Sequence, residues 1–384
     1  MKDLVKFELY KIFSKKIVLV LLVGCIVASL SNTVTSYLDI RSKGLSYYSI
    51  QKIGKEYEGQ IITEKKHDIF KKQCGDLLTK YNNGKILSDK EKVKAFGMTD
   101  YLIWINPEYM INGKLYKFDD MKKELKRLEK EGDTNSYQYK ELKYIHDLVS
   151  KKETPKYYFK FGWREATNFN MNCMWISILI LVSICTIFSN EYQSNTASIV
   201  LSSKNGQKKL TTAKIITGLI FSTFVFLIMN GIQVIILAMH GFKGWDVPMS
   251  FLSSYVRTPY TMNIGTFYVC GLIVSFIGTV LFTLLIMLVS LISKNNMISF
   301  AVSVATLLGP EFIGRFMPTY NLTKIFAELN IENLIGPINI FGNISTYNIF
   351  GKPVLYLNVI VTIGIISIPI VLYFINRIGK KQVV

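Results

Sequence analysis

Long apolar runs recur along the chain, and short polar stretches separate them in its second half. A helix needs about 20 predominantly apolar residues to cross the hydrocarbon core of a bilayer. Five runs reach this length and a sixth comes near it: 17–38, 169–189, 215–239, 264–292, 297–312 and 354–375. The pattern predicts an all-α polytopic membrane protein with six transmembrane helices.

The shortest run, 297–312, contains Gly309-Pro310 near its end, and this pair predicts a break in the fifth helix. The first run resembles a cleaved signal peptide in that a basic segment precedes it. A retained helix is favoured, since segment 1–16 is long and contains acidic residues and no A-x-A site follows the run. Residues 1–38 are therefore expected to form an N-terminal helix and the first span.

Residues 39–167 form one long hydrophilic insert in which charges of both signs alternate. Its length suits a small domain. Helix-start signals and charge pairs four residues apart predict helices at 88–96, 118–131 and 136–152. We expect a mainly helical domain with a few short strands. The aromatic run 157–163 predicts an aromatic belt at the membrane interface.

Basic residues in the short loops predict the orientation, because cytoplasmic loops carry an excess of lysine and arginine. With a cytoplasmic N-terminus, the inside basic residues are Lys2, Lys6, Lys11, Lys15, Lys16, Lys204, Lys208, Lys209, Lys214, Lys294, Arg377, Lys380 and Lys381. The short outside loops then hold only Lys243, Arg257, Arg315, Lys324 and Lys352. Both termini are therefore expected to be cytoplasmic, with the insert outside and the loop 190–214 inside.

This cytoplasmic loop predicts a short helix that lies across the mouth of the bundle. Asn190 is a suitable N-cap residue for this helix, and Gln193 lies three residues later, at the spacing of a capping box. Glu191 falls in the first turn, where the helix dipole favours an acid, and Asn205-Gly206 offers a left-handed stop. A simple connector whose lysines reach the lipid headgroups is the alternative.

The first 16 residues carry an apolar stripe at helical spacing, with lysines away from it. This pattern predicts an interfacial amphipathic helix that leads into the first span. The stripe residues are Val5, Leu9, Ile12 and Phe13. A simple membrane-surface anchor is the alternative.

The spans carry no Asp, Glu, Lys or Arg in their interiors, and Glu311 follows the Gly-Pro pair of the fifth run. Ion-driven secondary transporters usually need such groups or broken helices, so this absence argues against one. Asn230 and Gln233 are the most polar features inside a run. They indicate either a possible translocation path or hydrogen bonding between helices.

No catalytic or metal-binding signature is present: there is no H-E-x-x-H, and the five cysteines form no C-x-x-C pair. His67 and His146 have no nucleophile at an informative spacing. A phosphate loop, G-x-x-x-x-G-K-[ST], is also missing. The net charge of +18 raises the question of whether the chain binds nucleic acid. Because the lysines flank apolar runs or alternate with acids, we expect no nucleic-acid partner.

Two segments resemble the membrane subunit of type-2 ABC exporters, the ABC-2 permease family. They are FELYKIFSKK (7–16), before the first run, and FSNEYQSNTASIVLSSKNGQKKLTTAKIITG (188–218), between the second and third runs. On this match Glu191 corresponds to the acid of the family's loop and Lys214 to the lysine that opens the third span. Ser194-Asn195-Thr196 stands where the family commonly has a Gly-Thr pair.

The resemblance implies that the loop is a coupling helix resting in a groove of a separate ATPase. The implied coupling residues are Glu191, Tyr192, Gln193, Asn195, Thr196, Ser198 and Lys204. Two ATPase copies and a second permease, identical or homologous, would complete the complex in the bacterial cytoplasmic membrane. ATP and magnesium would bind to the partner ATPase, so this chain would be no enzyme and would bind no cofactor. The exported substrate would be amphipathic, such as an antimicrobial peptide, a toxin, a lipid or a drug.

In this family the segment between the last two spans often folds back into the membrane. Prolines divide the segment 310–350 of this chain into apolar pieces too short to cross, so we expect re-entrant helices there, within a 168–384 membrane domain. Two other functions stay open. One is a non-transporting receptor or scaffold with an extracellular sensing domain, and the other is export of sodium or another small ion by the same ABC architecture.

Overall fold

Six long apolar helices dominate the structure, which is a computed structural model describing residues 1–61, 63–98, 108–111, 114–153, 156–202, 208–316, 325 and 327–380. Each is long and apolar enough to span a membrane, so the prediction of a multi-pass, mainly helical membrane protein with six candidate spans is confirmed. The helices that carry these spans are α2 (Lys16–Ser42), α9 (Phe169–Ile184), α12 (Lys208–His240), α13 (Ile264–Ser293), α14 (Asn296–Phe316) and α18 (Tyr356–Lys380). The second span extends over Gly162–Gln193 when the short helices on both sides of α9 are included.

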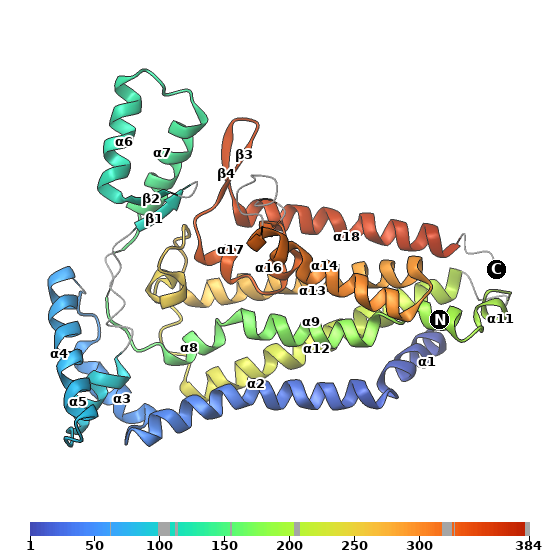
Figure 1. Cartoon of the computed structure of the whole chain (residues 1–384), viewed down its shortest axis with the longest axis horizontal. Coiled ribbons are helices and arrows are strands. Elements are labelled where there is room, and N and C mark those ends of the chain that lie inside the picture. Colours follow the sequence, from blue (N-terminus) through green and yellow to red (C-terminus); the bar gives the residue numbers. More distant parts are fainter. Residues whose placement is uncertain are drawn as a thin grey trace.

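The six helices lie side by side, and the connecting segments gather at two opposite ends of the bundle (Figure 1). Helices α1 (Lys2–Phe13), α10 (Ser189–Gln193) and α11 (Ala197–Ser202) lie at one end, which we call the loop end. The insert lies at the other, the insert end. The last turn of α18 also lies at the loop end, so both ends of the described chain are on one side.

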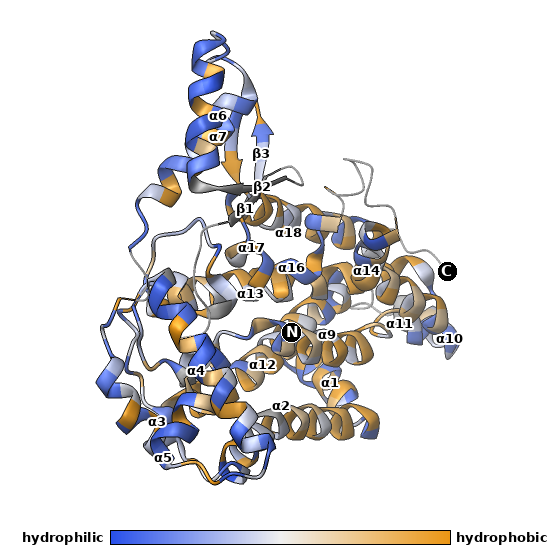
Figure 2. Cartoon of the chain, turned by 60° about the vertical axis from the view of Figure 1, so that its left-hand side comes forward, coloured by the Kyte–Doolittle hydropathy of each residue, from blue (hydrophilic) through white to orange (hydrophobic). Residues whose placement is uncertain are grey.

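Helices α9, α12 and α13 form the centre of the bundle, and residues such as Ile176, Phe221 and Phe282 are fully enclosed there. Helices α2, α14 and α18 lie around this centre and expose many large apolar side chains. Figure 2 shows the apolar residues along the bundle and the hydrophilic ones concentrated on the insert. Apolar surface of this extent needs lipid or another protein to cover it.

A helix, α1, forms where the sequence predicts one, and the C-terminal part of its apolar stripe faces protein. Ile12 is buried and the Phe13 ring lies edge-on to Phe221 of α12, with the ring centroids 5.5 Å apart. The expected separation of lysines from this stripe is wrong, because Lys2 and Lys6 line a groove together with the stripe residues Val5 and Leu9. Ile12 and Phe13 therefore pack α1 against the bundle, whereas Val5 and Leu9 line the groove.

The fifth span differs from its prediction, because the helix does not break at Gly309-Pro310. Helix α14 continues to Phe316, since a proline removes only one backbone donor and transmembrane helices tolerate that loss. Glu311 and Arg315 consequently lie one turn apart on the same helix, where they form an ion pair of 2.9 Å.

Two short helices, α16 (Ile331–Ile335) and α17 (Ile338–Gly342), lie within the segment expected to be re-entrant. Helix α16 packs beside the middle of α13, where the Ser275 hydroxyl donates a hydrogen bond of 2.6 Å to the carbonyl of Ile335. Gly278 of α13 allows this approach, because a Cβ there would lie 2.6 Å from the backbone nitrogen of Ile335. Residues 317–324 and 326 of the same segment lie outside the described part of the chain.

A β-hairpin precedes the last span, and the sequence did not predict it. Strands β3 (Thr346–Ile349) and β4 (Lys352–Leu355) pair antiparallel, so the predicted start of the sixth helix at residue 354 is wrong. At the tip of the hairpin, Phe350 and Gly351 both have positive φ, the conformation that a two-residue hairpin turn requires. The helix α18 begins directly after β4.

The described part of the insert is mainly helical, with one two-stranded sheet. Its elements are α3 (Tyr47–Gly54), α4 (Glu64–Asn82), α5 (Asp89–Lys92), a π-helix (Val93–Gly97), β1 (Glu108–Ile111), β2 (Lys114–Lys117), α6 (Phe118–Lys130) and α7 (Tyr137–Ser150), and α8 (Phe161–Ala166) joins it to the bundle. The three predicted helices are present, although the first continues as the π-helix. The aromatic belt is wrong for Tyr157 and Trp163, because both side chains are buried within the protein.

We predict that Gly278→Ala destabilises the protein, because its new Cβ would collide with the backbone of α16. The overpacking should lower the free energy of unfolding by about 1–3 kcal/mol, measured by thermal unfolding in detergent. The control is Gly231→Ala in α12, where a Cβ meets nothing within 4 Å. Equal stability of the two variants would show that α16 does not pack on α13 in this way.

Candidate functional site

The loop between the second and third spans contains two short helices rather than one. Helices α10 and α11 are separated at Ser194–Thr196, where Asn195 adopts a left-handed conformation with φ of 56°. The Thr196 hydroxyl donates to the carbonyl of Glu191 at 3.3 Å, which closes this turn. The predicted single helix is therefore wrong.

The predicted N-cap at Asn190 is also wrong, because α10 begins at Ser189 and its N-cap is Phe188, two residues before the predicted cap; Phe188 makes no side-chain cap bond. Asn190 instead accepts a hydrogen bond of 3.2 Å from the side chain of Asn296, at the start of α14. The Gln193 side chain accepts a bond of 3.3 Å from the backbone N–H of Asn296. Both side chains thus join the loop to another span and do not cap their own helix.

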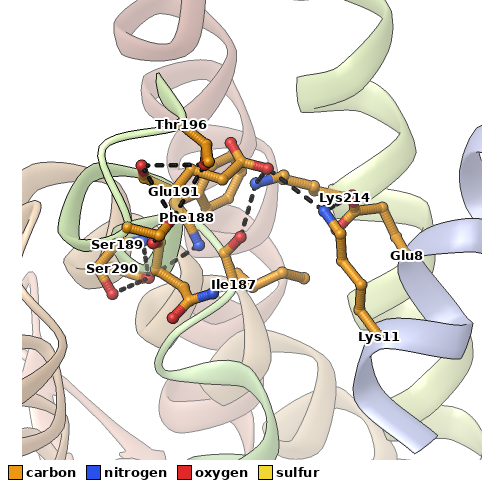
Figure 3. Close-up of polar contacts among 11 residues, drawn as sticks. Glu8, Lys11, Ile187, Phe188, Ser189, Glu191, Thr196, Lys214 and Ser290 are labelled. Carbon is orange, nitrogen blue, oxygen red and sulfur yellow. Dashed lines mark hydrogen bonds and ion pairs between the residues drawn. The ribbon is translucent and has the colours of Figure 1, made fainter. Parts of the chain in front are cut away.

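Lys214 is the centre of the site, because its ammonium group is buried in the protein with 1% of the side chain exposed (Figure 3). Its Nζ lies 2.7 Å from the Glu191 carboxylate and donates a hydrogen bond of 2.7 Å to the carbonyl of Ile187. The same nitrogen lies 4.9 Å from the centroid of the Phe188 ring. A buried charge needs such partners, since desolvation without them costs several kcal/mol.

Helix α1 adds a second pair of charges to this site. Glu8 is 3% exposed and lies 2.6 Å from the ammonium of Lys11, which also lies 3.5 Å from the Glu191 carboxylate. The order Glu8, Lys11, Glu191, Lys214 alternates in sign, and it connects α1, α10 and α12 (Figure 3). We call these four residues the charged joint.

Lys15 lies beside the joint, where α1 turns into α2. Its Nζ donates a hydrogen bond of 2.8 Å to the hydroxyl of Thr186. Burial lowers the pKa of Lys15 below its usual range, and the carboxylate of Glu8 partly opposes this shift. The N-terminal helix is thus tied to the second span by a bond as well as by packing.

The end of α13 and the start of α14 hold the other side of the loop. The Ser290 hydroxyl accepts hydrogen bonds of 3.1 Å from the backbone N–H groups of Phe188 and Ser189. The Ser189 hydroxyl donates a bond of 2.6 Å to Asn296. These bonds satisfy backbone donors that the start of α10 would otherwise leave unpaired.

The predicted coupling residues divide into two groups. Glu191 and Tyr192 are partly buried, and the Lys294 ammonium lies 4.9 Å from the centroid of the Tyr192 ring. The second group is exposed to solvent: Gln193, Asn195, Thr196 and Ser198. Lys204 lies outside the described residues.

Sequence reasoning did not identify Glu8, Lys11, Ser290 or Asn296 as parts of this site. The acid at position 8, three residues before a lysine on a helix otherwise rich in lysines, was a usable signal for an ion pair. Ser290 and Asn296 carry no such signal, because their partners lie about 100 residues away in sequence.

Asn230 and Gln233, the predicted translocation-path residues, lie within the helix contact between α9 and α12. The side chain of Asn172 donates to Asn230 at 3.2 Å and accepts from Gln233 at 3.3 Å. All three side chains are buried. The two residues therefore form hydrogen bonds between helices, which was one of the two interpretations of the sequence; the other was a translocation path.

Comparison with known proteins found no protein-family model and no curated protein that matches this chain. Among the described residues, no group of three or more His, Cys, Asp or Glu is arranged to hold a metal ion. The charged joint is therefore characterised by its geometry alone. Its charges are neutralised by one another, and it fixes α10 against α1 and α12, while Ser290 and Asn296 fix α10 against α13 and α14.

We predict that Lys214→Met lowers the free energy of unfolding by about 3–5 kcal/mol, because Glu191 loses its closest partner in a buried place. The double variant Lys214→Met with Glu191→Leu should recover most of this loss, since the remaining Glu8 and Lys11 still pair. Thermal unfolding in detergent measures both.

The matched control is Lys90→Met, which removes an ion pair of 2.7 Å with Glu56 on the exposed surface of the insert. This change should leave the melting temperature nearly unaltered, because exposed pairs contribute little. If the double variant were as unstable as Lys214→Met alone, the ion pair would not be the reason for the loss.

Proposed function

We propose that this chain is the membrane subunit of an ABC exporter of the type-2 permease group, driven by a separate ATPase that docks at the loop end. The charged joint is the observation that carries this proposal. A passive connector between two spans has no need of a buried Lys214–Glu191 pair. A lever that receives force from a partner must be fixed to the helices that it moves.

The distribution of basic residues supports an orientation in which the loop end faces the cytoplasm. Most basic residues of the bundle's connections lie there, and under the positive-inside rule such residues face the cytoplasm. They are Lys2, Lys6, Lys11, Lys15, Lys16, Lys208, Lys209, Lys214, Lys294, Arg377 and Lys380. The insert is then extracellular, and α1 lies at the inner interface of the bacterial cytoplasmic membrane.

The surface for the ATPase is the outer side of α10 and α11. Gln193, Asn195, Thr196 and Ser198 are exposed there, and Ile199 of α11 exposes 72% of its apolar side chain. An exposed apolar residue among small polar ones is suited to a groove on a partner protein. Ile199 was not among the coupling residues that the resemblance implied.

The mechanism follows from the bonds behind this surface. When two ATPases close on ATP, each pushes α10 of its own permease copy toward the bundle. The push reaches α12 through Lys214, α1 through Lys11, and α13 through Ser290. Helices so connected rotate as one body, and a cavity facing the inner leaflet opens outward for an amphipathic substrate.

We predict that Ile199→Asp prevents the ATPase from binding while the chain still folds, because a charge replaces an exposed apolar contact. Tagged protein is purified from its native membranes, and mass spectrometry identifies any co-purifying subunit with a phosphate loop. ATP hydrolysis by the complex is then measured. The variant should lose most of both the bound subunit and the activity, as for the central contacts of an interface.

The control is Ile86→Asp, where an isoleucine is 97% exposed. It lies in the sequence between α4 and α5 of the insert, which is at the opposite end of the molecule (Figure 1). This variant should retain the partner and its activity. If no ATPase co-purifies with the unaltered chain, a receptor or scaffold becomes the better functional assignment. If both variants lose the partner equally, the docking surface is not on α11.

A further inference from the structure

A groove of about 380 Å³ lies between α1 and the start of α12, on the side of α1 next to the charged joint. Its walls are mainly apolar, and two lysines stand at its edge. The residues that line it are Met1, Lys2, Val5, Lys6, Leu9 and Ile216. The export function proposed above does not use this groove.

The spacing along α1 explains why these side chains meet. Lys2, Val5, Lys6 and Leu9 are three or four residues apart, so they follow one stripe of the helix. The charged joint uses the neighbouring stripe, which contains Glu8 and Lys11. The two stripes therefore give α1 one charged contact with the bundle and one groove open to its surroundings.

No acidic residue in the described part of the chain pairs with the lysines of the groove. Lys2 and Lys6 are exposed, and neither forms an ion pair with any described residue. Asp3, the nearest acid in sequence, does not line the groove. Phe7 and Tyr10 of the same helix expose 56% and 69% of their side chains, as aromatic residues at a membrane interface do.

We propose that this groove binds one anionic phospholipid. A segment of an acyl chain lies against Val5, Leu9 and Ile216, and the phosphate pairs with Lys2 and Lys6. The combination of an apolar wall and two free ammonium groups is complementary to a lipid that has an apolar chain and a negative headgroup. A zwitterionic lipid offers the same chain but no net charge for the lysines.

The bound lipid also has a mechanical effect. It contacts α1 and α12 together, so it holds α1 in the position where Lys11 reaches Glu191. The lipid site rests on the groove alone and does not require the proposed exporter function. Failure of one therefore leaves the other unaffected.

The test places the purified full chain in nanodiscs of phosphatidylcholine that contain a photoactivatable phospholipid with a diazirine on its acyl chain. One sample carries the probe as phosphatidylglycerol and the other as phosphatidylcholine. After irradiation, mass spectrometry measures the label on α1 and on the peptide that contains Ile216. We expect the anionic probe to label these peptides several-fold more than the zwitterionic one.

The variant Lys2→Gln with Lys6→Gln should remove most of this preference and bring the labelling by the two probes close to equal, since each lysine near the membrane surface contributes to anionic lipid binding. The matched control is Lys208→Gln with Lys209→Gln, an equal change of charge at exposed positions of α12 outside the groove. It should keep the preference. Equal losses in both variants, or equal labelling by both probes, would overturn the site in favour of general attraction to the membrane surface.

Discussion

The arrangement of the loop end depends on one buried ammonium group. Lys214 lies in the first turns of a membrane-spanning helix with almost no exposure to solvent. A charge in that place is stable only if an opposite charge and a hydrogen-bond acceptor are held beside it. Glu191 and the carbonyl of Ile187 fulfil this requirement, so the end of the second span and the start of α10 have one permitted position relative to the third span.

The remaining contacts of the loop end follow from that position. With Glu191 placed at Lys214, its carboxylate is also near Lys11, and α1 can bury Glu8 without leaving a charge unpaired. On the other side, Ser290 receives the first free N–H groups of α10. The loop is thus bonded to helices from three separate parts of the sequence, which makes it part of the bundle and not a free connection.

The six spans and the helices of the insert could be predicted because their signals are local: apolar length, charge spacing and N-cap residues. The errors arose where distant contacts compete with local signals. Asn190 has the chemistry of an N-cap, yet Asn296 binds its side chain and the helix begins earlier. The hairpin β3–β4 could not be recognised in the sequence, because Val354 and Leu355 of β4 are continuous with the apolar run of α18. Glu191 and Lys214 were both selected from the sequence, but their burial as a pair requires the fold.

Helix α13 connects the loop end with the middle of the bundle. Its Ser290 binds the start of α10 at the loop end, and its Ser275 binds α16 near the middle of the bundle. These serines are 15 residues apart, about 22 Å along a helix. Between them Thr279 and Thr283 are buried, and their hydroxyls donate hydrogen bonds to the carbonyls of Ser275 and Thr279. Because α13 is one continuous helix, the hydrogen bonds to α10 and to α16 are held by a single element.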